Sequence, residues 1–223
     1  MRKLVALLPL KANSERVSGK NFREFHGKPL FRWTLDALLS LEKVEQVIIN
    51  TDARDLLENI GLPDSDKILI RDRKTEICGD LVSMNKVIAD DLNAVEASAY
   101  LMTHTTNPLI SPTTFSDAID SYFKSTQEGF DSVFSVNKYQ SRFFSDQLNP
   151  INHDPDNLIR TQDLQPMYEE NSCLYLFSRE SFIKKQSRIG LNPGVFVTPF
   201  SESVDIDDHD TWKLAEAYYT LFN

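Results

Sequence analysis

Three cations close to one another early in the chain are the first side chains that could do chemistry. Lys11, Arg16 and Lys20 fall within the segment 8–21 (LPLKANSERVSGKN), which follows an apolar run. The small and polar residues between them leave room for backbone amides to turn toward an anion. We interpret the segment as a polyphosphate site, and a solvated basic loop is the alternative. It contains neither of the phosphate-binding motifs GxxxxGK[ST] and GxGxxG. Side chains, in addition to backbone amides, would therefore bind the phosphates.

Two carboxylates near the end of the chain form the second constellation. Asp205 and Asp207 lie two residues apart in the segment 204–210 (VDIDDHD). In an extended chain both side chains point the same way, and such a pair suits Mg²⁺, which takes one or two carboxylates and completes its shell with water and phosphates. Asp208 would face away and cap the last helix. Capping and compensation of the helix dipole are the alternative function of the whole acidic run.

These groups must be positioned by strands and helices that alternate along the chain. Short apolar runs alternate with segments of helical period, which predicts parallel strands joined by helical crossovers. We therefore expect an α/β fold with a doubly wound, mostly parallel, Rossmann-like sheet. The predicted strands are 4–8, 44–50, 67–70, 98–103, 131–136, 172–177 and 195–198. One helix is predicted to begin near Pro29, which can stand in its first turn, and another follows the apolar stripe of 115–123. A last helix is predicted over 211–221, and we expect it to pack back on the sheet.

Length and charge limit the class of protein. With 223 residues, 41% of them hydrophobic, the chain is long enough for a real core, and we expect one domain over 1–223. A net charge of −9 argues against a nucleic-acid partner. Cys78 and Cys173 lack metal-type spacing, which favours a reducing cytoplasm. Pro9 and Lys11 interrupt the first apolar run well short of a membrane span, so we expect no membrane partner.

One segment departs from the alternation of strands and helices. Residues 139–168 are rich in Asn, Asp, Gln and Pro, with scattered apolar side chains such as Phe144 and Leu158. So long a stretch without a core pattern is typical of a functional loop or an interaction element, and its aromatic residues favour contact with another chain. We expect an insertion over 139–170 that forms a dimer contact. A disordered surface loop is the alternative.

Several short motifs occur in the order that is typical of one family. They are Leu8, Pro9, Ser14, Arg16, Lys20 and Asn21; 27–30 (GKPL); Thr51 and Asp52; Arg73, Glu76 and Ser83; Thr105, Thr106, Pro108 and Leu109; Arg160, Gln162, Asp163, Tyr168, Asn171, Tyr175 and Phe177; and 205–207 (DID) with Asp210 and 214–216 (LAE). On these residues, which run through most of the chain, the sequence resembles the acylneuraminate cytidylyltransferase family, the CMP-sialic acid synthetases and their relatives for other nonulosonic acids. Each motif is weak alone, but their order is specific.

The resemblance implies a nucleotide-diphospho-sugar transferase-like fold, a homodimer, and a reaction. The anomeric hydroxyl of a sugar acid would attack the α-phosphate of CTP, with Mg²⁺ as cofactor, giving a CMP-sugar and pyrophosphate. The expected catalytic residues are Lys11, Lys20 and Asp207, with the metal on Asp205 and Asp207. The expected nucleotide contacts are Leu10, Ala12, Asn13, Ser14, Arg16, Asn21, Arg73 and Ser83. The expected sugar contacts are His104, Thr105, Thr106, Lys138, Arg160, Gln162 and Asn171.

The chain also departs from the family pattern. Lys11 replaces an arginine, so bidentate contact with phosphate is lost although the charge remains. Ala12 and Asn13 replace two glycines, His104 replaces a glutamine, and Thr161 and Ser172 replace a basic residue and a glycine. Two alternatives stay open. One is a cytidylyltransferase for another sugar acid, such as the eight-carbon acid of the CMP-Kdo synthetases, although the segment 103–108 lacks their G-D-E-P. The other is a noncatalytic relative that binds a nucleotide sugar.

Overall fold

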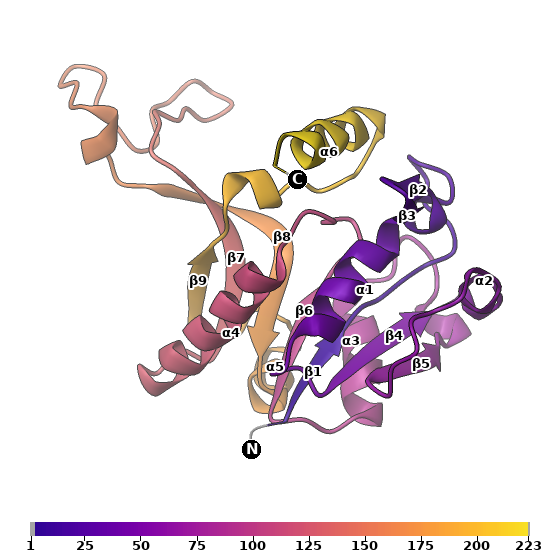
Figure 1. Cartoon of the computed structure of the whole chain (residues 1–223). Coiled ribbons are helices and arrows are strands. Elements are labelled where there is room, and N and C mark those ends of the chain that lie inside the picture. The colour runs from indigo at the N-terminus through magenta and orange to yellow at the C-terminus, as the bar shows by residue number, and fades with distance from the viewer. Residues whose placement is uncertain (1–2, 223) are drawn as a thin grey trace.

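A seven-stranded sheet forms the centre of the computed structural model, which describes residues 3–222 (Figure 1). The strand order across the sheet is β5-β4-β1-β6-β8-β7-β9. The strands are β1 (Leu4–Leu7), β4 (Gln46–Thr51), β5 (Ile68–Asp72), β6 (Ala99–Thr103), β7 (Ser132–Tyr139), β8 (Met167–Phe177) and β9 (Pro193–Val197). Only β8 runs antiparallel to its neighbours β6 and β7. The predicted mostly parallel α/β sheet is confirmed.

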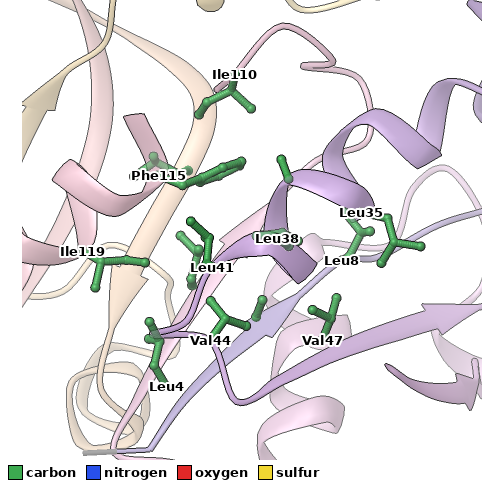
Figure 2. Close-up of a cluster of buried hydrophobic side chains, with 14 of the residues drawn as sticks. Leu4, Leu8, Leu35, Leu38, Leu41, Val44, Val47, Ile110, Phe115 and Ile119 are labelled. Atoms are coloured by element: carbon green, nitrogen blue, oxygen red, sulfur yellow. The ribbon is translucent and has the colours of Figure 1, made fainter. Parts of the chain in front are cut away.

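Helices cover both faces of the sheet, as a doubly wound fold requires. They are α1 (Leu30–Ser40), α2 (Arg54–Ile60), α3 (Met84–Ala94), α4 (Pro112–Gln127) and α5 (Arg179–Lys185). Along β1, Leu4 and Ala6 join the core under α1 and α4, whereas Val5 and Leu7 join a second core with α3 and α5. Figure 2 shows the first of these cores, in which Leu35 and Leu38 of α1 and Phe115 of α4 pack over the strands. The period of two in the strand divides its side chains between the two faces.

The helix α4 follows the apolar stripe that the sequence predicts. Phe115, Ala118, Ile119 and Tyr122 are buried on one side of it. Its first turn is capped because the Ser111 hydroxyl accepts a hydrogen bond from the Thr114 amide at 3.1 Å. The helix α1 begins directly after Pro29, which serves as its N-cap residue.

The last helix does not pack on the sheet, so this prediction was wrong. Helix α6 (His209–Phe222) buries Trp212 and Ala215 against Val17 and Phe25, which belong to the segment between β1 and α1, and against Leu30, the first residue of α1. That segment contains the short 3₁₀ helix η1 (Lys20–Phe22) and the hairpin of β2 (Glu24–Phe25) and β3 (Lys28–Pro29). The apolar pattern of a helix predicts that one face is buried, but it does not indicate which part of the protein packs against that face. This packing places α6 next to the hairpin of β2 and β3 (Figure 1).

The predicted insertion projects away from the sheet as an arm, which we define as residues 140–166 (Figure 1). Within 140–166 the only regular element is the 3₁₀ helix η3 (Thr161–Asp163), apart from an isolated bridge between Phe144 and Pro150. Strand β8 begins at Met167, five residues before the predicted start, because its first part pairs with the end of β7. Leu164 is buried, but several other apolar side chains along the arm are exposed, among them Phe144, Leu148, Ile151 and Leu158.

No helix within residues 3–222 combines the length and the apolar character that crossing a membrane requires.

Candidate active site

A cavity of about 310 Å³ lies at the edge of the sheet where β1 and β6 end. The order of the strands reverses here, since β1 lies between β4 and β6, and such a switch point is the usual binding crevice of an open α/β sheet. Ten of the residues expected from the sequence border this cavity: Lys11, Ser14, Arg16, Lys20, Asn21, Arg73, His104, Thr105, Thr106 and Asp207. The basic loop and the late acidic segment therefore share one site, as expected.

Lys20 and Arg16 meet Asp207 at this cavity. The Arg16 Nη2 lies 3.3 Å and the Lys20 Nζ 3.9 Å from the Asp207 Oδ1. Lys20 is buried, and its ammonium donates a hydrogen bond to the Ile206 carbonyl. Burial lowers the pKa of Lys20, and the charges of Asp205 and Asp207 oppose that effect. Lys20 is thus a desolvated cation held in place by the backbone of the last segment.

Lys11 has a different partner, which the sequence did not indicate. Its ammonium forms an ion pair with Asp80, and both side chains border the cavity. Asp80 lies between the 3₁₀ helix η2 (Thr75–Ile77) and α3. A carboxylate is therefore the partner of the cation that the sequence analysis expects to contact phosphate.

The backbone of the basic loop is fixed by hydrogen bonds from neighbouring strand ends. The Asn21 Nδ2 donates to the Lys11 carbonyl at 2.8 Å, and the Thr105 hydroxyl donates to the Asn21 Oδ1 at 2.7 Å. The Ala12 amide donates to the Asp52 Oδ1 at 2.7 Å. Buried Asn21 therefore holds the loop against the segment after β6, and its side-chain amide is engaged by the protein itself.

Arg73 is held by a buried polar relay, which we define as Asp91, Asn50 and Arg73. The Asn50 Nδ2 donates to the Asp91 Oδ1 at 2.7 Å, and the Arg73 Nε donates to the Asn50 Oδ1 at 3.0 Å. The Arg73 Nη2 also donates to the Asn50 carbonyl at 2.8 Å. Because a carboxylate only accepts, Asp91 fixes the Asn50 amide so that its oxygen faces Arg73. Arg71 pairs with both Asp91 and Asp90.

Asp205 is not among the residues that border the cavity. Its Oδ1 is buried and has no hydrogen-bond partner among the described residues. Burial raises the pKa of Asp205, and the charge of Asp207 adds to this, while a hydrogen bond with the Thr106 side chain opposes it. Within residues 3–222, no group of three or more His, Cys, Asp or Glu side chains is arranged to hold a metal. A cation here would need further ligands from substrate or water.

His104 borders the cavity on the side of β8. Burial lowers its pKa to about 3, and the charges of Arg188 and Lys20 add to that effect, so the ring is neutral. The Thr34 hydroxyl donates to the His104 carbonyl at 3.4 Å.

Other expected nucleotide contacts lie next to the cavity without bordering it. Leu10 is buried and pairs with Thr51 in an isolated parallel bridge, while Ala12 is partly buried and Asn13 is exposed. Ser83 caps α3, where its hydroxyl accepts from the Asn85 amide at 3.3 Å.

Four of the expected sugar contacts do not border this cavity. Lys138 is exposed on β7, and Gln162 is exposed on the arm. Arg160, also on the arm, pairs with Asp163, with its Nε 2.7 Å from the Oδ2. Asn171 is buried, and its Nδ2 donates to Asn137 and Thr198 at 3.0 and 2.6 Å. The side chain of Asn171 therefore serves the packing of β8 against its neighbours.

Four residues that border the cavity were not named as site residues from the sequence: Pro9 and Glu15, which lie within the segment 8–21, and Asp80 and Met84. It also missed Asn50 and Asp91, which hold Arg73. Asp91 carried a detectable signal, because it is a carboxylate within the buried face of a helix, beside Val87, Ile88 and Leu92. Such a residue is unusual unless it is paired.

Comparison with known proteins gives a consistent result. The family model described as Cytidylyltransferase matches residues 5–196. The chain is 24% identical over 214 residues to an N-acylneuraminate cytidylyltransferase of Streptococcus agalactiae, covering 93% of this chain and 51% of that protein. It therefore spans about half the length of this relative.

Two further relatives are matched over nearly their whole length. The pseudaminic acid cytidylyltransferase of Campylobacter jejuni is 20% identical, over 98% of this chain and 97% of that protein. The CMP-N,N'-diacetyllegionaminic acid synthase of Legionella pneumophila is 24% identical, with the same shares covered.

Solved structures share the fold. A CMP:2-keto-3-deoxy-manno-octonic acid synthetase complexed with CTP superposes with a TM-score of 0.66 at 15% identity, over 98% of this chain and 99% of that chain. The 4-diphosphocytidyl-2C-methyl-D-erythritol synthase of Anaerococcus prevotii has a TM-score of 0.69 at 14% identity, over 98% and 96%.

Proposed function

The chain belongs to the cytidylyltransferase family, and from this premise we propose that it transfers CMP from CTP to the anomeric hydroxyl of a nonulosonic, sialic-type sugar acid. The observation that carries the proposal is the meeting of Lys20, Arg16 and Asp207 in one cavity. Relatives named for neuraminate, pseudaminate and legionaminate support this class of acceptor.

The order of the strands supports a division of the site into three parts. Arg73 follows β5 and lies on one side, which we assign to the cytidine. The basic loop follows the central β1 and faces the triphosphate. His104, Thr105 and Thr106 follow β6, next to β8, and we assign this side to the sugar acid. A nucleotide lying across the crevice would thus present its α-phosphate between the base side and the acid side.

Such a transfer depends mainly on positioning of the two substrates and on electrostatic stabilisation of the phosphates, and not on a covalent intermediate with the protein. The anomeric oxygen forms a bond to the α-phosphorus while the bond from that phosphorus to the bridging oxygen breaks, and pyrophosphate leaves. Lys11, Arg16 and Lys20 hold the phosphates and the charge that develops on them. Asp207 accepts the proton of the attacking hydroxyl. Lys20 acts without reorganisation because it is already buried and bonded to the Ile206 carbonyl.

Two carboxylates support Mg²⁺ as the cofactor of the proposed reaction. The buried, unpartnered oxygen of Asp205 is a polar atom that an ion would satisfy, and Asp207 borders the cavity beside it. We propose that Asp205 and Asp207 hold the metal and that substrate phosphates complete its shell, as is usual for Mg²⁺. Bound there, the metal would supply neutralisation of phosphate charge.

A homodimer and a cytoplasmic location complete the proposal. The exposed apolar residues of the arm support a contact between two copies, which would carry Lys138, Arg160 and Gln162 toward the partner's site. The thiols of Cys78 and Cys173 are both free, which supports a reducing compartment.

The experiment is pyrophosphate release with CTP, Mg²⁺ and a panel of sugar acids, compared with the other three nucleoside triphosphates. We expect release with CTP and a nine-carbon acid. Release with the eight-carbon acid alone would favour the Kdo alternative, and binding without release would favour the noncatalytic one.

Asp207→Ala should lower kcat by about 100-fold or more, because it removes a metal ligand and the proton acceptor together. The matched control is Asp210→Ala, three residues later, whose carboxylate is exposed and pairs with Lys213. Circular dichroism should show both variants folded. Turnover by Asp207→Ala at the wild-type rate would remove its proposed role.

A further inference from the structure

Arg188 lies beside the cavity in a position that the sequence analysis did not single out. It belongs to the segment between α5 and β9. Its guanidinium carbon lies 3.8 Å from the centre of the Tyr175 ring, and its Nη2 lies 3.5 Å from the Glu170 carboxylate. The Arg188 amide donates to the Asn85 Oδ1 of α3 at 3.3 Å. The side chain is only 19% exposed, so the guanidinium is held in one place by an aromatic face and a carboxylate of β8.

The guanidinium also donates a long contact to the Met102 Sδ at 3.8 Å, and a further contact determines the proton position of His104. The Arg188 Nη1 lies 3.3 Å from the His104 Nε2. A guanidinium donates hydrogen bonds and cannot accept them, so the Nε2 must be the acceptor. A neutral imidazole carries one proton, which is then on Nδ1.

The Nδ1 of His104 is available to a ligand. No hydrogen bond joins it to any of residues 3–222, and it is not among their buried atoms that lack a partner. The ring borders the cavity on the side that we assign to the sugar acid. The positive charges of Arg188 and Lys20 act on this ring, so the same wall favours an electron-rich partner.

We propose that Arg188 is a positioning residue that holds His104 as a neutral Nδ1–H donor, and that this donor recognises an acceptor oxygen of the sugar acid. The inference rests on the proposed function and deepens it, because it identifies how one wall of the site recognises the acceptor substrate and leaves the nucleotide side unaffected.

The first test uses the ligand-free protein and needs no activity. The ¹⁵N shifts of the imidazole nitrogens, assigned among the four histidines by comparison with His104→Gln, should show the Nδ1–H tautomer in the wild type. In Arg188→Met the Nε2–H form should appear. A wild-type ring that is already Nε2–H or mixed would overturn the inference.

The second test is a double-mutant cycle in steady-state kinetics. Arg188→Met should raise the KM for the sugar acid about tenfold, the typical cost of losing one good hydrogen bond, with the KM for CTP nearly unchanged. Arg188→Lys should restore part of the loss, since an ammonium can still donate to Nε2. In the His104→Gln background, Arg188→Met should raise the KM for the sugar acid less than about threefold, because a glutamine amide has no tautomer to select.

Arg179→Met is the matched control. Arg179 is also a partly buried arginine, but it donates to the Leu92 carbonyl and to Asn93, away from the cavity. The inference would be overturned if Arg188→Met raised the KM for the sugar acid by the same factor in the wild-type and His104→Gln backgrounds. It would also be overturned if Arg188→Met raised the KM for CTP as much as the KM for the sugar acid. An inactive wild type would overturn the proposed function instead, and the spectrum of the ligand-free ring would still decide what Arg188 does.

Discussion

At the scale of single residues, the site is governed by carboxylates that hold its cations before any substrate arrives. Asp207 pairs with Arg16 and Lys20, and Asp80 pairs with Lys11. These pairs keep the cations near one another although like charges repel. Under the proposed function a triphosphate would compete with these carboxylates, and that competition can be measured.

Asp80→Asn should increase the affinity for CTP about two- to fivefold, because the Lys11–Asp80 pair is partly exposed and pairs of that kind are weak. Titration calorimetry with CTP measures it. Asp120→Asn is the control, since it makes the same change in net charge at a distant pair with Lys43. A weaker affinity in Asp80→Asn would mean that Asp80 positions Lys11 for phosphate rather than competing with it.

The neighbours Asp90 and Asp91 predict opposite pH dependences of stability. Burial raises the pKa of Asp91 to about 6 from 3.8. Between these values the folded state binds more protons than the unfolded state, so the free energy of unfolding falls as pH rises. Asp91→Asn should abolish this loss. Its stability relative to the wild type should rise from pH 4 to pH 6.5 by up to about 3 kcal/mol.

Asp90→Asn is the matched control. Burial alone would raise the pKa of Asp90, but hydrogen bonds from Lys74 and Arg71 outweigh it and lower that pKa. Asp90 therefore contributes stability above about pH 4 that is lost as pH falls through its folded pKa. Asp90→Asn should be less stable than the wild type at pH 7, with a difference that shrinks in acid. Urea unfolding at several pH values measures both variants, and parallel pH profiles would contradict the assignment.

At the scale of elements, the ends of helices and strands decide where functional residues are placed. Helix α5 ends at Lys185, and its C-cap residue Gln186 has a left-handed φ of 55°, after which the chain continues to Arg188. Ser172 likewise has a φ of 59° within β8, next to the register shift between β7 and β8. The family resemblance expects glycine at Ser172, and the left-handed backbone explains why. Sequence alone showed the substitution but not this backbone.

Gln186→Gly should stabilise the protein by about 1 kcal/mol, since glycine adopts the left-handed conformation without the steric cost that a side chain meets there. Chemical denaturation measures the change. Lys184→Gly, two residues earlier within α5, is the control and should destabilise by about 1 kcal/mol. If both variants lost stability, the hydrogen bond from the Gln186 side chain to the Ile183 carbonyl would outweigh the strain.

At the scale of the whole molecule, the arm is the feature that a single chain leaves unexplained. Several of its apolar residues are exposed, with Leu148 78% and Leu158 66% accessible. Arg160, one of the arm's two arginines, does not border the cavity of its own chain. A second copy covering the arm would account for both observations.

Leu148→Asp and Leu158→Asp should each weaken a homodimer about 10- to 100-fold, because burying one leucine contributes about 1.5–3 kcal/mol. Analytical ultracentrifugation measures the monomer–dimer equilibrium. Leu56→Asp is the control, on helix α2, which lies on the other side of the molecule from the arm (Figure 1). A wild type that is monomeric at high concentration would contradict the proposal.

The sequence by itself determined the alternation of strands and helices, the basic loop after β1, the acidic pair before α6 and the arm. These follow from local periodicity, composition and motif order. The tertiary structure alone decided that α6 packs on the loop after β1, that Asp80 neutralises Lys11, that Asn171 is engaged in the sheet, and that Arg188 faces His104. Each of these depends on residues far apart in sequence, such as Lys20 and Ile206, which are 186 positions apart. Which distant groups meet is set by how the layers pack, and a local pattern carries no information about that.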